Sequence, residues 1–149
     1  ASLQVGGGKE MGRAPSFEEW VAQVPESLKQ DPLWDFQVYP KALYFYDLAW
    51  EDCEYLLKDP RGRAVAHQLI RSAGSISANI EEGYGRGYGK EYSYFLRVSI
   101  GSARETRGWY YRGRRLLPPD VFKHRLSLLD EIIAMLAPNI QRQRQYQRK

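Results

Sequence analysis

Four long segments of this chain repeat one spacing of apolar side chains. The first segment steps by three or four residues through Leu43, Tyr46, Trp50, Cys53 and Leu57. The same step recurs over residues 66–80, 92–117 and 122–140. A period of about 3.5 residues gives a helix one apolar side, which is buried against similar sides of neighbouring helices. The spacing predicts an all-α protein whose residues 39–140 form an antiparallel up-down-up-down four-helix bundle.

A further helix is predicted before the bundle. Ser16 and Glu19 match a capping box, in which a serine and a glutamate three residues later satisfy the first backbone N–H groups of a helix. Trp20 begins the apolar side of that helix, and Pro25 interrupts it. We expect an N-terminal amphipathic helix, or arm, over residues 16–38.

Three other segments lack an apolar period. Residues 1–15 contain three successive glycines, and we expect a flexible leader there. Glycines alternate with other residues over 83–89, which predicts a mobile linker between two helices. Residues 141–149 include four Lys or Arg, and we expect this basic tail to fray. Pro138 is expected to kink the last turns of the fourth segment.

No stretch of the chain has the composition of a membrane span. The longest run without a charged residue, 132–141, has ten residues, whereas a membrane-spanning helix needs about 20. The single cysteine, Cys53, cannot form an internal disulfide, and no charged and then apolar leader opens the chain. We therefore expect a cytoplasmic protein with no membrane partner.

Charge is divided unevenly along the chain. Residues 1–59 contain 11 Asp or Glu and 5 Lys or Arg, whereas residues 60–149 contain 7 and 17. The first part therefore has a net charge of −6 and the second a net charge of +10. Such a division is typical of a basic part that meets a polyanion, or of acidic and basic faces that dock within an assembly. A solvated surface of mixed charge is the remaining alternative.

Residues that commonly carry catalysis are few and scattered. His67, His124 and Cys53 lie in different segments, without the Glu-x-x-His pair of carboxylate-bridged metal bundles. The glycines of 83–89 match neither common phosphate-binding glycine pattern, and no strand precedes them. The chain has no nucleophile elbow and no Cys-x-x-Cys. We expect no metal, no cofactor and no enzymatic activity, although sequence alone leaves a triad of distant residues open.

The third segment combines arginine with aromatic residues. The candidate nucleic-acid-binding residues are Arg97, Arg104, Arg107, Trp109, Tyr111, Arg112, Arg114 and Arg115, with Arg86 and Lys90 near the start of the segment. Offsets of three, four and seven residues place Arg97, Arg104 and Arg107 in one broad stripe. Guanidinium groups bind phosphates through two hydrogen bonds, and indole and phenol rings stack on unpaired bases. The segment therefore predicts a surface that binds RNA or DNA with little sequence preference.

A structural role for the same residues is the alternative. In that case Arg104 and Arg107 pair with acids of the first segment, while Trp109 and Tyr110 fill the core. The acids concerned are Asp47, Glu51, Asp52 and Glu54. The surplus of ten positive charges over residues 60–149 favours nucleic acid, and both roles can hold together.

One run of residues is specific enough to indicate a family. The run QLIRSAGSISANIEEG covers residues 68–83, and it is followed by Arg86, by Phe95 and Leu96, and by residues 101–105. These residues resemble the four-helix bundle family encoded in intervening sequences of 23S ribosomal RNA, over roughly residues 35–140. That family is related to the accessory variability determinant of diversity-generating retroelements. The resemblance implies a homopentameric ring, and the retroelement relatives imply a nucleic-acid-binding surface and a reverse transcriptase partner.

Polar residues accompany the apolar side of the second segment. Burying such groups is costly unless they are hydrogen-bonded, so we interpret them as a network, buried or at a subunit contact, that fixes helix register. The predicted structural network consists of Arg71, Ser75, Asn79, Glu82 and Glu105. A catalytic role for these residues is the alternative.

Together these features predict a non-enzymatic accessory protein that forms a homopentameric ring, binds RNA or DNA and assists a retroelement reverse transcriptase. Residues 106–115 are more aromatic and richer in arginine than the family pattern, which favours nucleic-acid binding. The alternative is an adaptor ring that binds only a protein, through the acidic first segment or the helix side that holds Phe17, Trp20 and Val24.

Overall fold

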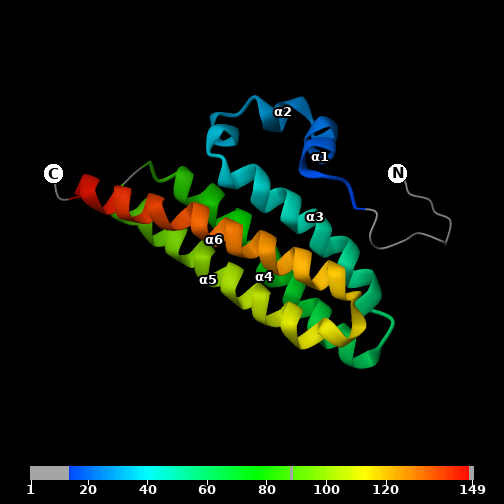
Figure 1. The fold of residues 1–149 in the computed structure, drawn as a ribbon. Helices are drawn as coiled ribbons and strands as arrows, with labels where there is room; N and C mark the ends of the chain where they lie inside the picture. Colours follow the sequence, from blue (N-terminus) through cyan, green and yellow to red (C-terminus); the bar gives the residue numbers. More distant parts are fainter. Residues whose placement is uncertain (1–13, 88, 148–149) are drawn as a thin grey trace.

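Four long helices pack side by side, and a short helical arm lies across one of them (Figure 1). The computed structural model describes residues 14–87 and 89–147, with side chains as far as Arg142. The bundle helices are α3 (Val38–Leu56), α4 (Pro60–Tyr84), α5 (Lys90–Gly113) and α6 (Pro119–Gln147). Each runs antiparallel to the next, and α6 returns beside α3. The all-α up-down-up-down bundle is confirmed, and the described residues contain no strand.

The predicted apolar spacing is correct for α4 and α5. From Ala66 to Ile80 and from Tyr92 to Leu117, the residues at that spacing are all buried. Many of them are small, so the two helices make the most extensive contact in the bundle. At Gly83 a Cβ atom would lie 2.9 Å from the Cβ of Phe95, which is too close for two carbon atoms that are not bonded. Glycine has no Cβ and therefore fits at this position. The α4 and α5 backbones therefore approach closely, as their composition predicts.

Hydroxyl groups within the α4–α5 contact are hydrogen-bonded. The Ser99 hydroxyl donates to the Ile76 carbonyl at 2.8 Å, and the Thr106 hydroxyl lies 2.8 Å from that of Ser72. These side chains are buried. Their bonds offset the cost of removing polar groups from water.

The predicted apolar spacing is wrong for α3. Of its five predicted core residues only Cys53 is buried, whereas Trp50 and Leu57 are 59% and 49% exposed. The core instead receives Ala42, Phe45, Ala49, Asp52 and Leu56. Helix α3 carries apolar residues on two sides, so periodicity alone does not distinguish the buried side from the exposed one.

Glycine and proline set the helix ends. Gly89 is the N-cap of α5 and has a φ of 92°, and Gly87 before it has a φ of 87°. Residues with a side chain rarely adopt such angles, so glycine permits the chain to leave α4 and enter α5 here. The linker predicted over residues 83–89 is too long, because Gly83 and Tyr84 belong to α4 and Gly83 packs against α5. Asp59 caps α4 just before Pro60, and the turn Arg114–Leu116 (η3) leads from α5 to α6.

Helix α6 continues through Pro138 to Gln147, rather than ending near residue 140. Pro138 lacks the N–H that would bond the Ala134 carbonyl, but both residues are exposed, so water can satisfy that carbonyl. Asn139 donates to the Met135 carbonyl at 3.0 Å, and Ile140 is buried. These contacts keep the last turns helical. Of the predicted tail, the side chains beyond Arg142 lie outside the described residues.

The arm consists of α1 (Phe17–Gln23), α2 (Glu26–Lys29) and the turn Pro32–Asp35 (η2). The capping box of Ser16 and Glu19 is present, and Pro25 separates α1 from α2 as expected. Aromatic rings hold the arm against α3, because Phe17 and Trp20 pack on Tyr44 at 5.5 and 5.6 Å. The arm therefore folds back on its own bundle. Residues 1–13 of the predicted leader lie outside the described residues.

None of the helices that the structure describes combines the length and the apolar character required to cross a membrane.

Candidate nucleic-acid interface

Helix α5 turns a row of arginines and tyrosines away from the bundle. The row, here called the outer row, consists of Tyr94, Arg97, Arg104 and Tyr111 of α5 and Arg115 of the turn η3 that follows it. All five are exposed, and they recur at helical spacing because the opposite side of α5 is packed into the core. Residues 90–117 contain seven Lys or Arg and only two Glu. The outer row is therefore the centre of a cationic face.

The arginines of the outer row are not neutralised by carboxylates of the described residues. Within residues 14–87 and 89–142, no ion pair involves Arg97, Arg104 or Arg115. Arg97 instead lies 5.9 Å from the centre of the Tyr94 ring. Such a contact orients a guanidinium group and leaves its N–H groups available to an anion.

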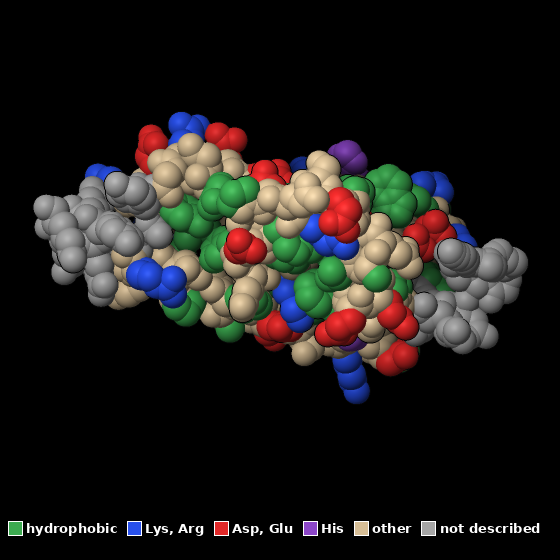
Figure 2. Space-filling view, turned by 90° about the horizontal axis from the view of Figure 1, so that it is seen from above, with side chains coloured by type: hydrophobic (Ala, Val, Ile, Leu, Met, Phe, Trp, Pro, Cys, Tyr) green, Lys and Arg blue, Asp and Glu red, His purple; other side chains and the backbone are tan. Residues whose placement is uncertain are grey.

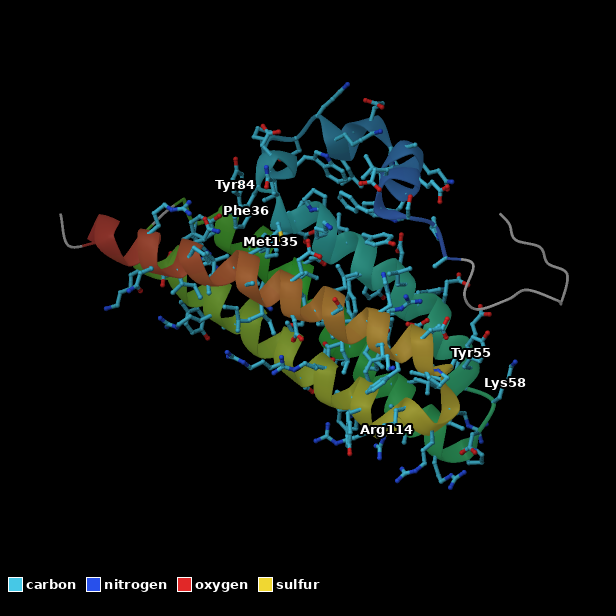
Figure 3. The ribbon with its side chains drawn as sticks, in the orientation of Figure 1. Phe36, Tyr55, Lys58, Tyr84, Arg114 and Met135 are labelled. Carbon is cyan, nitrogen blue, oxygen red and sulfur yellow. The ribbon has the colours of Figure 1, made fainter. Side chains whose placement is uncertain are left out.

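Two further arginines cover aromatic rings beside the outer row. The Arg114 guanidinium lies 3.8 Å from the centre of the Tyr111 ring, and that of Arg112 lies 4.6 Å from Trp109. Arg114 also donates to the Tyr111 carbonyl at 2.9 Å. Figure 3 shows Arg114 at the end of the bundle where α5 meets α6. These groups extend the cationic face toward that end.

Most of the other predicted nucleic-acid-binding residues form hydrogen bonds or ion pairs with neighbouring side chains. Arg107 donates to Asp130 of α6 at 2.7 Å, so it lies beside the outer row and is paired. The indole N–H of Trp109 donates to Glu105 at 3.0 Å, and the ring is partly buried. Arg86 pairs with Glu82 at 2.9 Å. Lys90 is exposed at the first turn of α5.

The predicted polar network divides into three separate groups. Asn79 donates to the hydroxyl of Ser75 at 2.8 Å, and Ser75 contacts Ser102 of α5 at 2.8 Å. Arg71 pairs with Glu105, and the third group is the pair of Glu82 and Arg86. These residues lie at the rim of the α4–α5 contact and are partly or fully exposed. A helix face wider than the contact leaves its outer polar residues in solvent, so a single buried network does not form.

Glu105 remains ionised at neutral pH. The hydrogen bond from Trp109 and then the Arg71 guanidinium lower the pKa of its carboxyl group. Its charge is therefore balanced within the chain. The outer row keeps its own positive charge, because Glu105 pairs toward α4.

A buried ion pair joins α3 to α6, and the sequence did not predict it. The Arg125 guanidinium donates to both carboxylate oxygens of Asp52, at 2.7 and 3.0 Å, and the Tyr110 hydroxyl donates to the same carboxylate at 2.6 Å. Burial and the Asp52 charge raise the pKa of Tyr110. Asp52 stands four residues before the buried Leu56, so a correct register for α3 would have indicated an acid in the core.

This pair also corrects the alternative in which acids of α3 neutralise the arginines of α5. Asp52 is bound by Arg125, and Asp47 accepts the indole N–H of Trp20 at 2.7 Å. Arg107 takes its carboxylate from α6 instead. Asp47 and Asp52 are therefore bound elsewhere, and α5 turns the outer row away from the core.

No group of three His, Cys, Asp or Glu residues could hold a metal ion in the part of the chain that the structure describes. Cys53 is buried, and burial raises the pKa of its thiol to about 11. His67 and Cys53 lie on neighbouring helices, and His124 lies beside Arg125 on α6.

Comparison with known proteins locates the bundle within a family. The family model described as "23S rRNA-intervening sequence protein" matches residues 34–138. The match spans α3, α4, α5 and most of α6, and it begins after α1 and α2. No curated protein and no solved structure matches the chain. Because the match covers more than half of the chain, this protein belongs to the 23S rRNA-intervening sequence protein family.

Proposed function

We propose that this protein is a non-enzymatic accessory protein that binds RNA or DNA through the outer row of α5. The observation that carries this proposal is the exposure of Arg97, Arg104 and Arg115 without carboxylate partners in the described part of the chain. Unpaired guanidinium groups attract phosphates, and the release of counterions from the nucleic acid favours binding. Tyr94 and Tyr111 add exposed rings on which bases can stack.

The proposed binding has little sequence preference. A single row on the convex outer side of a helix contacts phosphates and stacks on bases, and neither contact distinguishes one base from another. This supports a role in holding a strand for another protein, rather than in recognising a site.

We further propose that the protein assembles into a homopentameric ring and assists a reverse transcriptase in the cytoplasm. Five copies of a chain with net charge +4 carry +20, which concentrates a polyanion around the ring. Sedimentation of the purified protein tests the assembly. The proposal expects five chains of 17.3 kDa, and any other stoichiometry would contradict the ring.

The binding proposal is tested with a triple variant, Arg97→Ser, Arg104→Ser and Arg115→Ser. The matched control removes three exposed charges elsewhere, with Arg61→Ser, Arg63→Ser and Lys123→Ser. The measurement is the fluorescence anisotropy of a labelled single-stranded RNA of about 25 nucleotides, between about 50 and 200 mM salt.

The outer-row variant is expected to bind at least about tenfold more weakly, with a salt slope smaller by about 2 than that of the parent, because three phosphate contacts are lost. The control variant is expected to retain most of the salt slope of the parent. Equal affinity and slope in the parent and the outer-row variant would overturn the proposal. Absence of binding by the parent at about 50 mM salt would favour the adaptor alternative.

A further inference from the structure

Helix α3 carries a second apolar side that is half-buried at Leu43 and Tyr46 and exposed at Trp50 and Leu57. This α3 stripe consists of Leu43, Tyr46, Trp50 and Leu57. Trp50 is 59% exposed, and its ring lies 6.3 Å from that of Tyr46. The stripe extends over 15 residues, from Leu43 to Leu57, with about 21 Å of helical rise between its ends. Elsewhere on the described surface, the only exposed large apolar side chains besides Leu28 are tyrosines.

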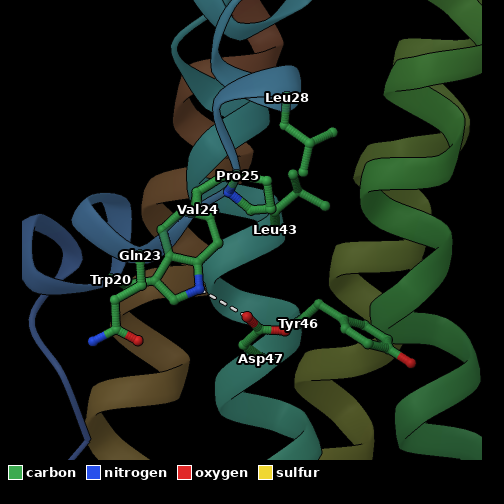
Figure 4. A pocket seen from close by; sticks show the side chains of 8 residues that line it. All are labelled: Trp20, Gln23, Val24, Pro25, Leu28, Leu43, Tyr46 and Asp47. Atoms are coloured by element: carbon green, nitrogen blue, oxygen red, sulfur yellow. Dashed lines mark hydrogen bonds between the residues drawn. The ribbon is translucent and has the colours of Figure 1, made fainter.

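The arm and α3 form a groove at one end of this stripe. The groove has a volume of about 310 Å³, and most of its lining is apolar. Its lining residues are Trp20, Gln23, Val24, Pro25, Leu28, Leu43, Tyr46 and Asp47 (Figure 4). The close-up shows Tyr46 directed from α3 toward α4, where its ring lies against Gly74. Leu28 and the arm side of the groove precede the family match, which begins at residue 34.

Acidic residues predominate in the segment that forms this apolar surface. Residues 16–58 contain nine Asp or Glu, of which Asp52 is buried, three Lys and no Arg. At the far end of the stripe, Arg63 of α4 donates to the Leu57 carbonyl at 3.5 Å. Asp47 lies in the groove, and Glu54 stands between Trp50 and Leu57 on the exposed side of α3. Figure 2, which looks down on the arm, shows acidic side chains interspersed with apolar ones. The surface would therefore repel a nucleic acid and attract a cationic partner.

We propose that the groove and the α3 stripe bind a basic amphipathic helix of another protein. Trp50 and Leu57 would pack against apolar residues of that helix, and Glu54 and Asp47 would face its Lys or Arg. The residues that the structure describes do not supply such a helix through the outer row. Its exposed basic face, the outer row, has arginines and tyrosines but no aliphatic side chain. The proposal is independent of nucleic-acid binding, because α3 and the outer row of α5 do not share residues.

The test uses a fluorescein-labelled peptide of about 18 residues, designed with Leu on one side of a helix and Lys on its flanks. A scrambled peptide of the same composition has no apolar side. Anisotropy is measured with the full chain, with Trp50→Ala, and with Glu54→Lys. The control Tyr94→Ala removes an equally exposed ring from α5. Thermal unfolding followed by circular dichroism checks that each variant is folded.

The parent and Tyr94→Ala are expected to bind the designed peptide with equal, saturable affinity. Trp50→Ala is expected to lower that affinity about tenfold or more, as loss of a central tryptophan does at protein interfaces. Glu54→Lys is expected to lower it more at low salt than at high salt. Equal binding of the scrambled peptide, or full affinity in Trp50→Ala, would overturn the proposal. Absence of binding of the designed peptide by the parent would also overturn it. A change of oligomeric state in Trp50→Ala would then assign the stripe to a second copy of this chain.

Discussion

Arg125 and Arg104 have the same side chain, and the packing of the bundle gives them opposite environments. Arg125 is only 4% exposed, and its guanidinium group donates twice to Asp52. Arg104 is exposed on the outer side of α5 and has no ion pair with any described residue. The buried charge therefore holds two helices together, whereas the charge of the outer row is available to a ligand.

The buried pair lies where the bundle has the least other contact. It joins α3 to α6, and these two helices make the least extensive of the four neighbouring contacts in the bundle. Two hydrogen bonds from Arg125 and one from Tyr110 fix the position of the carboxylate. A buried pair need not be more stabilising than apolar residues of the same size, but it specifies one arrangement of α3 against α6.

The largest loss of stability is expected when the buried arginine, Arg125, is replaced. Arg125→Met leaves the Asp52 carboxylate buried without its cation, and we expect the free energy of unfolding to fall by about 3–5 kcal/mol. Urea unfolding followed by circular dichroism measures the change. The double variant Asp52→Leu and Arg125→Met is expected to recover much of the loss. A loss below about 1 kcal/mol in the single variant would show that the pair is not buried as described.

Tyr110→Phe is expected to have a smaller effect. It removes the hydroxyl that donates to Asp52 but keeps the ring, which packs edge-on against Phe45 at 6.0 Å. A hydrogen bond to a charged group is worth about 1.5–3 kcal/mol, so the free energy of unfolding should fall within that range. The same urea experiment applies. Unchanged stability would mean that water satisfies the carboxylate.

A pH dependence is expected at His124, beside the buried pair. Arg125 can only donate, so His124 Nδ1 accepts its N–H at 2.6 Å and the ring is neutral. Desolvation and the Arg125 charge lower the pKa of His124. The unfolded chain then binds more protons, and stability falls as the pH decreases below the unfolded value of about 6.5. His124→Gln should reduce this fall between about pH 7.5 and 5.5, measured as urea midpoints.

The smallest change of stability is expected when the exposed arginines of the outer row are replaced. Replacing Arg97, Arg104 and Arg115 by Ser should change the free energy of unfolding by no more than about 0.5 kcal/mol for each residue. These side chains have no ion pair to lose within the described residues. A large loss of stability would mean that the outer row is buried in a subunit contact.

Sequence patterns predicted the fold where a helix has a single apolar side. Helices α4 and α5 have one such side each, so the period identified their buried residues correctly. Helix α3 has two, and the period selected the exposed one. The deciding feature is the pair of Asp52 with Arg125, 73 residues apart, and no local pattern reveals a contact over that distance.

Part of the candidate interface could also be predicted from helical spacing alone. Helical spacing placed Arg97, Arg104 and Tyr111 on one side of α5 without knowledge of its neighbours. The pairing of Arg107 with Asp130, and of Trp109 with Glu105, depends on which helix lies beside each face or on side-chain rotamers. These pairings depend on how the helices pack. The sequence therefore predicted more arginines without carboxylate partners than the structure shows.

The central claim is that the outer row is accessible and meets a nucleic acid. Labelling with phenylglyoxal, which modifies accessible guanidinium groups, followed by mass spectrometry compares both environments in one experiment. We expect Arg97, Arg104 and Arg115 to react in the free protein and to be protected by single-stranded RNA, while Arg125 stays unreactive in both states. Outer-row arginines that are unreactive in the free assembly, or that react equally with RNA present, would contradict the account.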